Sequence, residues 1–405
     1  GVGYTAYPDN LIEKFVAESW ENGVDIFRIF DSQNWMQSIE PCINHVRKNT
    51  GGIAEASMCY TGNILDKNRS KYDLKYYLQL AKDLENAGAH ILAIKDMAGL
   101  LQPYAATELI GSLKQTVNIP IHLHTHDTSS MQAGTYANAI DAGVDVVDVA
   151  LGGLSGLTSQ PNFNALAEVL NHHERAPELN KDSLQEYSIY WEQVRSYYAP
   201  FESGLKSGSG DVYHHEIPGG QYSNLVPQAA SLGLADRFYE ITDMYAKVNE
   251  LFGDIIKVTP SSKVVGDMAQ FLVSNNLSID DVLQRGEGLA FPQSVKSFFK
   301  GDLGQPVYGF PKKVQSIILG SEKPYTDRPN AHLNPIDFDK AFADFKDKFS
   351  AQFDRELEMT DFLSYQLYPK VFEDAAKHHA QFGNVMRIPT KNFFYGMEED
   401  EEITI

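Results

Sequence analysis

Three histidines alternate with other residues in the stretch PIHLHTHDT, which runs from Pro120 to Thr128. Side chains two residues apart in a strand point to the same face, so His122, His124 and His126 share one side of a predicted strand. An H-x-H pair at a strand end can place two imidazoles on one metal ion. The alternative is a set of histidines that only pack or hydrogen-bond within the protein. His122 lies roughly 7 Å deeper along the strand, so we expect it to be structural and the other two to be metal ligands.

Lys95 is the second candidate, because it stands in the otherwise apolar stretch ILAIKDMAG. Burial of an unpaired ammonium group is costly. Lys95 must therefore lie at a rim, form an ion pair with Asp96 or another neighbour, or be chemically modified. A modified lysine could form a Schiff base, or it could react with CO₂ to give a carbamate. A carbamate would replace the cation by an anionic oxygen ligand, which suits a metal beside two histidines.

A third candidate group is the stretch KVTPSSK, which begins at Lys257. It places Thr259 before a proline and Ser261 and Ser262 after it. Ser and Thr are ordinary N-cap residues, because their side-chain oxygens accept hydrogen bonds from free N–H groups at a helix start. Taken alone, the stretch therefore favours the cap of a helix that begins at Val264 over a catalytic role.

The elements that would position these residues repeat one pattern, in which an amphipathic helix, a glycine and a short apolar strand follow one another. The glycines Gly23, Gly88 and Gly143 suit the left-handed conformation that ends a helix. Strands that alternate with helices at this spacing form βα units and a parallel sheet. The five predicted strands are Val24–Asp31, Ile53–Tyr60, His90–Asp96, Pro120–Asp127 and Val144–Ala150.

Polar residues follow the carboxyl ends of these strands, where the catalytic residues of a (β/α)₈ barrel gather. We therefore predict an α/β fold with a TIM-type barrel. Five units cannot close an eight-stranded barrel, so we expect three strands to precede Gly1 and the chain to be a fragment. A doubly wound open sheet is the alternative, but no glycine-rich phosphate-binding fingerprint follows any strand.

After Asn171 the βα rhythm stops, and long helical patterns take over. We predict three parts: a barrel over residues 1–171, a helical funnel over its mouth at 172–330, and a helical extension at 331–405 that contains the link RIPTKNFFYG and leads into a following domain. The stretch Lys206–Leu225 lacks periodicity and is predicted to be a functional or interface loop. The predicted helices are Asp182–Tyr198, Leu234–Phe252, Val264–Asn275 and Asp337–Phe353.

Composition limits the classes of partner and compartment. The 405 residues carry a formal net charge of −20, so nucleic acid and anionic membranes are poor partners. Cys42 and Cys59 are the only cysteines, too few for a disulfide framework or a cysteine-based zinc site. We therefore expect a reducing, cytoplasmic location. No apolar stretch approaches the roughly 20 residues of a membrane-spanning helix.

Seven motifs, in this order and spacing, resemble the carboxyltransferase domain of pyruvate carboxylase, a biotin-dependent family. They are VGYTAYPDN, FRIFDS, IKDMAGLL, HLHTHDT, GLSGLTSQP, IPGGQYSNL and KVTPSSKVVGD, and together they extend over nearly the whole chain. The resemblance implies a barrel with a helical funnel and a divalent metal, zinc or manganese, at the rim. It implies transfer of a carboxyl group from carboxybiotin to pyruvate to give oxaloacetate.

Residue roles follow from the same resemblance. His124, His126 and a carboxylated Lys95 are implied as metal ligands, and Thr259 as the proton shuttle between pyruvate and biotin. Ser262, Lys263 and Tyr4 are implied to form the biotin pocket. The implied partners are a biotin carrier domain and a biotin carboxylase domain, in a homotetramer. ATP would be used only at another domain of the parent chain.

Two features of the family are absent from this sequence. They are a first-strand segment with an Asp metal ligand and a Gln, and a third-strand Arg that binds pyruvate. We expect both to lie before Gly1, so the sequence as given lacks one metal ligand. Related barrels leave rival functions open: the oxaloacetate decarboxylase alpha subunit, the transcarboxylase subunit, and aldol-type lyases or synthases. A non-catalytic scaffold is a rival of another class.

Overall fold

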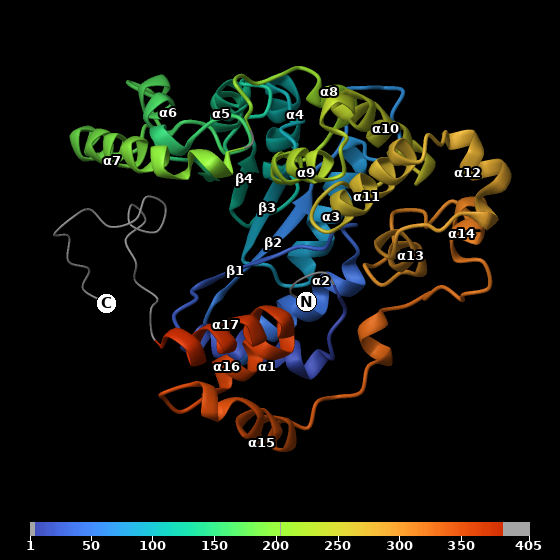
Figure 1. Cartoon of the computed structure of the whole chain (residues 1–405). Coiled ribbons are helices and arrows are strands. Elements are labelled where there is room, and N and C mark those ends of the chain that lie inside the picture. Colours follow the sequence, from blue (N-terminus) through green and yellow to red (C-terminus); the bar gives the residue numbers. More distant parts are fainter. Residues whose placement is uncertain (1–4, 203, 384–405) are drawn as a thin grey trace, which may run out of the picture.

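The first half of the chain contains a parallel sheet (Figure 1). The computed structural model describes residues 5–202 and 204–383. Its five strands follow one another in the order β1-β2-β3-β4-β5, and each pairs in parallel with the next. The predicted βα repeat is therefore confirmed. The strands are β1 (Ile26–Ile29), β2 (Ile53–Cys59), β3 (Ile91–Asp96), β4 (Ile121–Thr125) and β5 (Val146–Val147).

The strands are shorter than the sequence predicted, most clearly at β5, which was predicted to end at Ala150. The ladder to β4 continues only to the bond from the Asp148 N–H to the carbonyl of Leu123. Beyond it, Ala150 forms a parallel bridge with Asn162 instead. A change of hydrogen-bond partner therefore ends this strand early.

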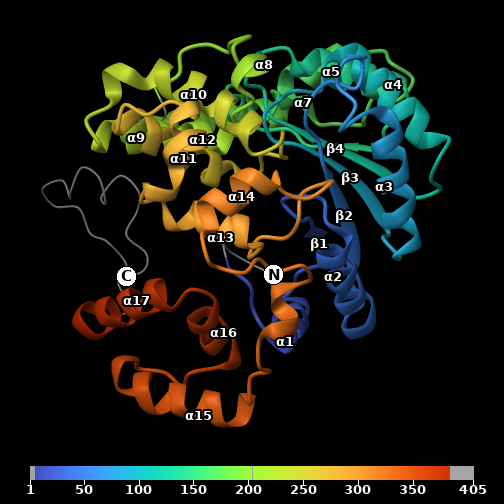
Figure 2. The same ribbon diagram turned by 90° about the vertical axis from the view of Figure 1, so that its right-hand side faces the viewer.

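Helices cover one face of the sheet (Figures 1 and 2). Helices α2–α5 connect the strands, and α1, α3 and α5 are followed, as predicted, by glycines with positive φ: Gly23 at 96°, Gly88 at 97° and Gly143 at 101°. Helix α1 precedes β1. These helices are α1 (Asp9–Glu21), α2 (Met36–Asn49), α3 (Leu74–Asn86), α4 (Pro103–Lys114) and α5 (Gln132–Asp141).

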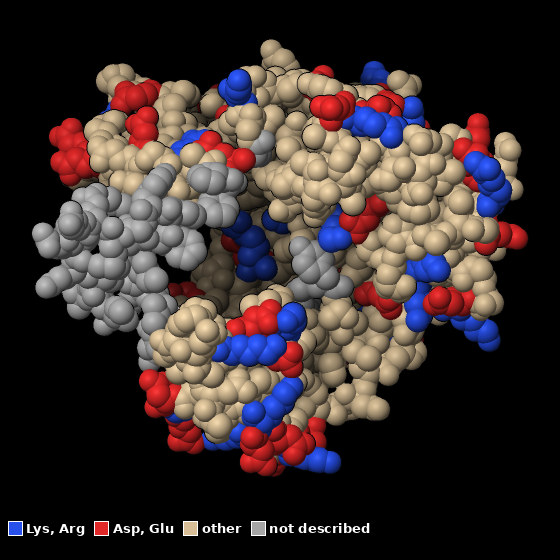
Figure 3. Space-filling view, viewed as in Figure 1, with Lys and Arg blue, Asp and Glu red and all other residues tan. Residues whose placement is uncertain are grey.

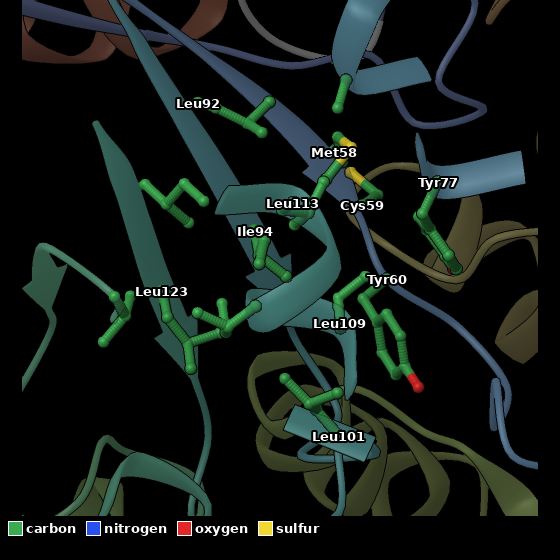
Figure 4. Packing of buried hydrophobic residues seen from close by; sticks show 14 of the residues in the cluster. Met58, Cys59, Tyr60, Tyr77, Leu92, Ile94, Leu101, Leu109, Leu113 and Leu123 are labelled. Carbon is green, nitrogen blue, oxygen red and sulfur yellow. The ribbon is translucent and has the colours of Figure 1, made fainter. Parts of the chain in front are cut away.

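Alternate residues of the strands make the two faces of the sheet chemically different. Leu92 and Ile94 of β3 and Leu123 of β4 pack with Leu109 and Leu113 of α4 in the main core (Figure 4). Full burial of each such side chain contributes about 1.5–3 kcal/mol. The residues between them point to the opposite face, which carries charged and polar groups. These are Arg28, Glu55, Lys95, His122 and His124.

A monotonic strand order with a helical layer on the apolar face is the arrangement of a TIM-type barrel. A doubly wound sheet reverses its strand order at a switch point, and the described strands show no such reversal. The edge strands each have a single strand partner, and Ile26 is 51% and Val146 43% exposed. The TIM-type fold class is confirmed.

Helices dominate the second half of the chain. The described part of the C-terminal extension, up to residue 383, contains helices α15–α17, and the link RIPTKNFFYG lies outside the described residues. None of the helices in the described part of the chain combines the length and apolar character that crossing a bilayer requires. The helices are α6 (Phe163–Val169), α7 (Lys181–Arg195), α8 (Val212–His215), α9 (Gly219–Ser231), α10 (Phe238–Leu251), α11 (Ser261–Ser274), α12 (Ile279–Arg285), α13 (Gln293–Lys300), α14 (Lys312–Leu319), α15 (Phe338–Phe349), α16 (Met359–Leu367) and α17 (Pro369–Phe382).

Two predictions for this half need correction. The stretch Lys206–Leu225, predicted to be a functional or interface loop without periodic structure, contains α8 and the first half of α9. Glu216 ends α8 in the left-handed conformation, and Pro218 is the N-cap residue of α9. The helix predicted from Val264 begins three residues earlier, at Ser261. Proline at a helix start needs no N–H partner, and this allows both starts.

Buried apolar residues form three clusters in the described residues: one between sheet and helices, one among α9–α14, and one among α15–α17. The third also contains Tyr7, Leu11 and Ile12, so α1 packs against the C-terminal helices. The division at residues 171 and 330 stays a prediction. Helices α8, α9 and α11 lie over the carboxyl ends of the strands (Figure 1), so they and the strand ends together define the site.

Candidate active site at the carboxyl ends of the strands

Two imidazole rings face each other at the end of β4. The Nε2 atoms of His124 and His126 are 3.2 Å apart, and the ring planes lie at 79°. The sequence predicted this pairing from the period of a strand. The structure brings the two side chains together as expected.

The partners of the other ring nitrogens decide where the protons lie. Nδ1 of His126 donates to the carbonyl oxygen of Thr158 at 2.7 Å, because a carbonyl can only accept. Nδ1 of His124 donates to the carboxylate of Asp148 at 2.8 Å. In the neutral rings both Nε2 atoms therefore present lone pairs to each other.

Two facing lone pairs repel unless a cation lies between them. Burial lowers the pKa of both rings, and for His126 burial together with the neighbouring His124 lowers it to about 4. Both histidines therefore stay neutral, as metal ligands must. Hydrogen bonds from Nδ1 to a carboxylate and a carbonyl are the usual support of metal-binding histidines. The pair fits a divalent metal by this test.

His122, the deeper histidine, has a different environment. Its Nδ1 contacts Glu55 at 3.0 Å and its Nε2 contacts Asp148 at 2.8 Å. Burial opposes a positive ring, but the hydrogen bonds to these two carboxylates raise its pKa to about 9. Arg28 joins the same group through hydrogen bonds to Glu55 and Asp148. Because both its nitrogens are occupied, His122 acts as a structural cation, as its depth in the strand suggested.

Lys95 lies beside the histidine pair, since it is the register partner of His124 across β3 and β4. Its Nζ is 5.1 Å from the centre of the Phe30 ring, and burial lowers its pKa. The carboxylate of Asp96 is directed elsewhere, because it accepts hydrogen bonds from two backbone N–H groups and from Thr125. The ion pair with Asp96 that the sequence allowed is therefore wrong.

Among the described residues, no group of three or more acidic, histidine or cysteine side chains is placed so that it could hold a metal ion. Lysine belongs to none of these types. Lys95 is thus the candidate for a further ligand beside the histidine pair, provided that it carries an anionic oxygen.

Thr259 lies on the wall of a cavity of about 640 Å³ that reaches the end of β1, where Arg28, Phe30 and Asp31 line it. Figure 3 shows this side of the molecule hollowed above α15–α17, with Lys and Arg side chains in the hollow. Pro260 occupies the N-cap position of α11, and no side chain accepts a capping hydrogen bond there. The interpretation of Thr259 as the cap residue is therefore wrong. The Thr259 hydroxyl is thus available for another role.

Ser262 and Lys263 lie in the first turn of α11. The Ser262 hydroxyl is buried and has no hydrogen-bond partner among the described residues. The Lys263 ammonium contacts Asp267 at 2.6 Å, and Asp267 also accepts a hydrogen bond from Ser294. A buried hydroxyl without a hydrogen-bond partner fits a residue that would hydrogen-bond a polar ligand. Tyr4, the third predicted pocket residue, lies outside the described residues.

Sequence reasoning missed Asp148, Glu55 and Arg28. Asp148 was detectable in principle, because it follows β5 at the same rim as the predicted site residues. Glu55 and Arg28 are charged residues inside apolar strands, which is the signal that singled out Lys95. Their partners could not be read from spacing.

Two family models match the chain. One described as HMGL-like matches residues 28–189, and one described as Conserved carboxylase domain matches residues 212–405. Fold and site thus define an HMGL-like α/β barrel joined to a carboxylase domain. The carboxyl transferase domain of Rhizobium etli pyruvate carboxylase is 48% identical with a TM-score of 0.95, over 100% of this chain and 67% of that one. The chain belongs to this family, the carboxyl transferase domains of pyruvate carboxylase.

The curated relatives point to the same family. The pyruvate carboxylase of Bacillus subtilis is 52% identical over 404 residues, which are 100% of this chain and 35% of that protein. The human mitochondrial pyruvate carboxylase is 42% identical over 407 residues, 100% of this chain and 34% of that protein. The chain therefore spans about a third of the length of the curated relatives it matches.

Proposed function

We propose that this chain transfers a carboxyl group from carboxybiotin to pyruvate and so forms oxaloacetate. The observation that carries the proposal is the His124–His126 pair beside Lys95. Thr259 lines a cavity that also contains Arg28, Phe30 and Asp31 at the end of β1. Family membership supports it, and the related Rhizobium etli domain has been solved with pyruvate and biocytin at a TM-score of 0.96.

His124, His126 and Lys95 would hold a divalent metal, zinc or manganese, with Lys95 as a carbamate. Such an ion, when bound, stabilises negative charge on an oxygen of the substrate. Burial lowers the pKa of Lys95 and so increases the share of its uncharged amine, which is the form that reacts with CO₂. Asp148 and Thr158 keep the two imidazoles oriented.

Thr259 moves the proton. Its hydroxyl receives a proton from the methyl group of pyruvate and donates its own toward the biotin pocket. A threonine hydroxyl is a weak acid, so this step depends on the donor and acceptor lying in line on its two sides. Ser262 and Lys263 from α11, with Tyr4, form the pocket in this proposal, and the unpaired Ser262 hydroxyl supports it.

The remaining partners lie in other parts of the full-length protein. These are the biotin carrier domain and the biotin carboxylase domain, where ATP is used, in a homotetramer. We keep a cytoplasmic location as part of the proposal, and the two free cysteines, Cys42 and Cys59, support it. Nucleic acid and membranes are not among the proposed partners.

The test is an assay of the full-length protein with pyruvate, bicarbonate and ATP. We expect oxaloacetate to form, and to be lost when the carrier lysine is not biotinylated. Parallel assays of oxaloacetate decarboxylation and of transfer to an acyl-CoA separate the rival barrels. Decarboxylation or transcarboxylation without net carboxylation of pyruvate would replace the proposed function, and inactivity with no bound metal would favour a scaffold.

A further inference from the structure

A group of charged side chains lies between the barrel and the segment that carries Thr259. Lys257, two residues before Thr259, is only 2% exposed. Its ammonium group contacts the Glu216 carboxylate at 2.5 Å and lies 3.9 Å from Asp254. A buried ammonium needs such a partner, because desolvation otherwise disfavours the charge.

Glu216 also contacts the barrel. Its other carboxylate oxygen accepts from Nη1 of Arg69 at 2.7 Å, and Arg69 lies in the loop between β2 and α3. The same guanidinium binds both oxygens of Asp254, at 2.7 and 3.2 Å. Two cations and two carboxylates thus form one neutral cluster, which we call the Glu216 cluster: Glu216, Lys257, Arg69 and Asp254.

Lys71, from the same loop, holds the adjacent backbone. Its ammonium donates to the carbonyl oxygens of Gly253 at 2.6 Å and of Asp254 at 2.9 Å. The segment before Thr259 is therefore fixed from one side by the β2–α3 loop and from the other by Glu216.

The position of Glu216 connects this cluster to the histidine pair. Glu216 has φ of 54°, a conformation that costs free energy for a residue other than glycine and persists only where the surroundings hold it. Three residues later, Gly219 lies so close to the pair that a Cβ atom there would be 2.8 Å from Nδ1 of His126. One short segment thus touches both His126 and, through Lys257, the Thr259 segment.

We propose that Glu216 is a positioning residue that sets the place of Thr259 relative to the histidine pair. It acts through Lys257 and touches no reacting atom. The inference rests on the proposed role of Thr259 in proton transfer. Displacement of a reacting group by about 1 Å can lower a rate by about 100-fold. A residue that only positions Thr259 can therefore have a large effect on kcat.

The test uses the full-length biotinylated protein and the variant Glu216→Gln. The amide keeps the shape but removes the anion at 2.5 Å from the buried ammonium of Lys257, so that only Asp254 remains, at 3.9 Å. We expect kcat for oxaloacetate formation to fall about 30-fold, with KM for pyruvate within about twofold of wild type. Hydrogen exchange should be at least about tenfold faster at the amide of Ser262, which donates to the Val258 carbonyl, and unchanged in β4.

Two further variants keep the test specific. Glu216→Gln combined with Lys257→Met removes both charges and should recover about tenfold of the lost kcat, because no unpaired cation stays buried. Glu240→Gln breaks an exposed pair with Arg237 in the same helical region and should change neither readout.

The proposal is overturned if Glu216→Gln keeps kcat within about threefold of wild type or leaves exchange at Ser262 unchanged. It is also overturned if the double variant is no better than the single one. A wild-type protein that forms no oxaloacetate contradicts the proposed function instead, and the exchange measurement still decides whether Glu216 holds this segment.

Discussion

The Nε2 atoms of His124 and His126 lie 3.2 Å apart, with the Nδ1 atoms of both rings hydrogen-bonded to acceptors. This relationship defines the candidate metal centre, since two neutral imidazoles present lone pairs to one point. Removal of either ring should therefore remove the metal.

His124→Ala or His126→Ala should lower the metal content of the purified full-length protein below about a tenth of the wild-type level, because one imidazole cannot replace two. Elemental analysis measures the content. His214→Gln is the matched control, because this histidine is exposed and pairs only loosely with Asp243 at 3.6 Å. Retention of full metal by both alanine variants would place the metal elsewhere.

Asp148→Asn should weaken metal binding by about 10- to 100-fold, because loss of a supporting carboxylate frees the ring it orients. The asparagine also removes one of the two carboxylates that His122 and Arg28 share, and leaves Glu55 as the other. Competition with a chelator measures the affinity. Asp141→Asn is the control, since Asp141 is an exposed carboxylate that pairs with His173. Equal affinities in both variants would show that Asp148 does not support the site.

Gly219→Ala should weaken metal binding about tenfold, because a Cβ atom would come within 2.8 Å of Nδ1 of His126 and 2.9 Å of the Thr158 carbonyl. The neighbouring Gly220→Ala is a close control, because its Cβ would meet nothing within 4 Å. The same chelator competition compares the two variants. Equal metal affinities in the two variants would show that the close approach of the Gly219 backbone to His126 does not affect metal binding.

Thr259→Ala should keep the fold and the metal but lower carboxyl transfer by at least about 100-fold, the usual scale of a lost acid–base group. Thr242→Ala on α10 is the control, because its hydroxyl only bonds the carbonyl of Tyr239. Rates of oxaloacetate formation are compared at equal biotin and metal content. Near-normal transfer in Thr259→Ala would remove this residue from the mechanism.

The stability of the protein should fall in acid partly through Glu216. Burial raises the pKa of this carboxyl, but Lys257 and Arg69 outweigh it and lower the pKa from 4.5 to about 2. A lowered folded pKa means that the stabilisation is complete above pH 4.5 and is lost as pH falls toward 2. The contribution is on the order of 3 kcal/mol.

Urea unfolding at several pH values measures this dependence. Glu216→Gln should be less stable than wild type at pH 7, and the difference should shrink as pH falls below 4.5, because the protonated glutamate resembles the amide. Glu240→Gln, at an exposed pair, should follow the wild-type curve. A constant difference between Glu216→Gln and wild type across this range would contradict the assignment.

Local patterns in the sequence were sufficient for the elements of the barrel. The glycines that follow α1, α3 and α5 and the alternation within the strands depend on a few neighbouring residues, so both could be read without the fold. The pairing of His124 with His126 belongs to the same class, because two residues along one strand always share a face. A single charge in an apolar strand also singled out Lys95, but it left a rim position, an ion pair and a chemical modification open.

Contacts between distant segments were decided only by the tertiary structure. Asp148 meets His124 from 24 residues away, and Glu216 meets Lys257 from 41 residues away. Strand β5 ends early because Ala150 forms a bridge with Asn162. Helix α11 begins at Ser261, with Pro260 at its N-cap position. Spacing along the chain does not specify such partners, because they follow from how the helices and loops pack over the strand ends.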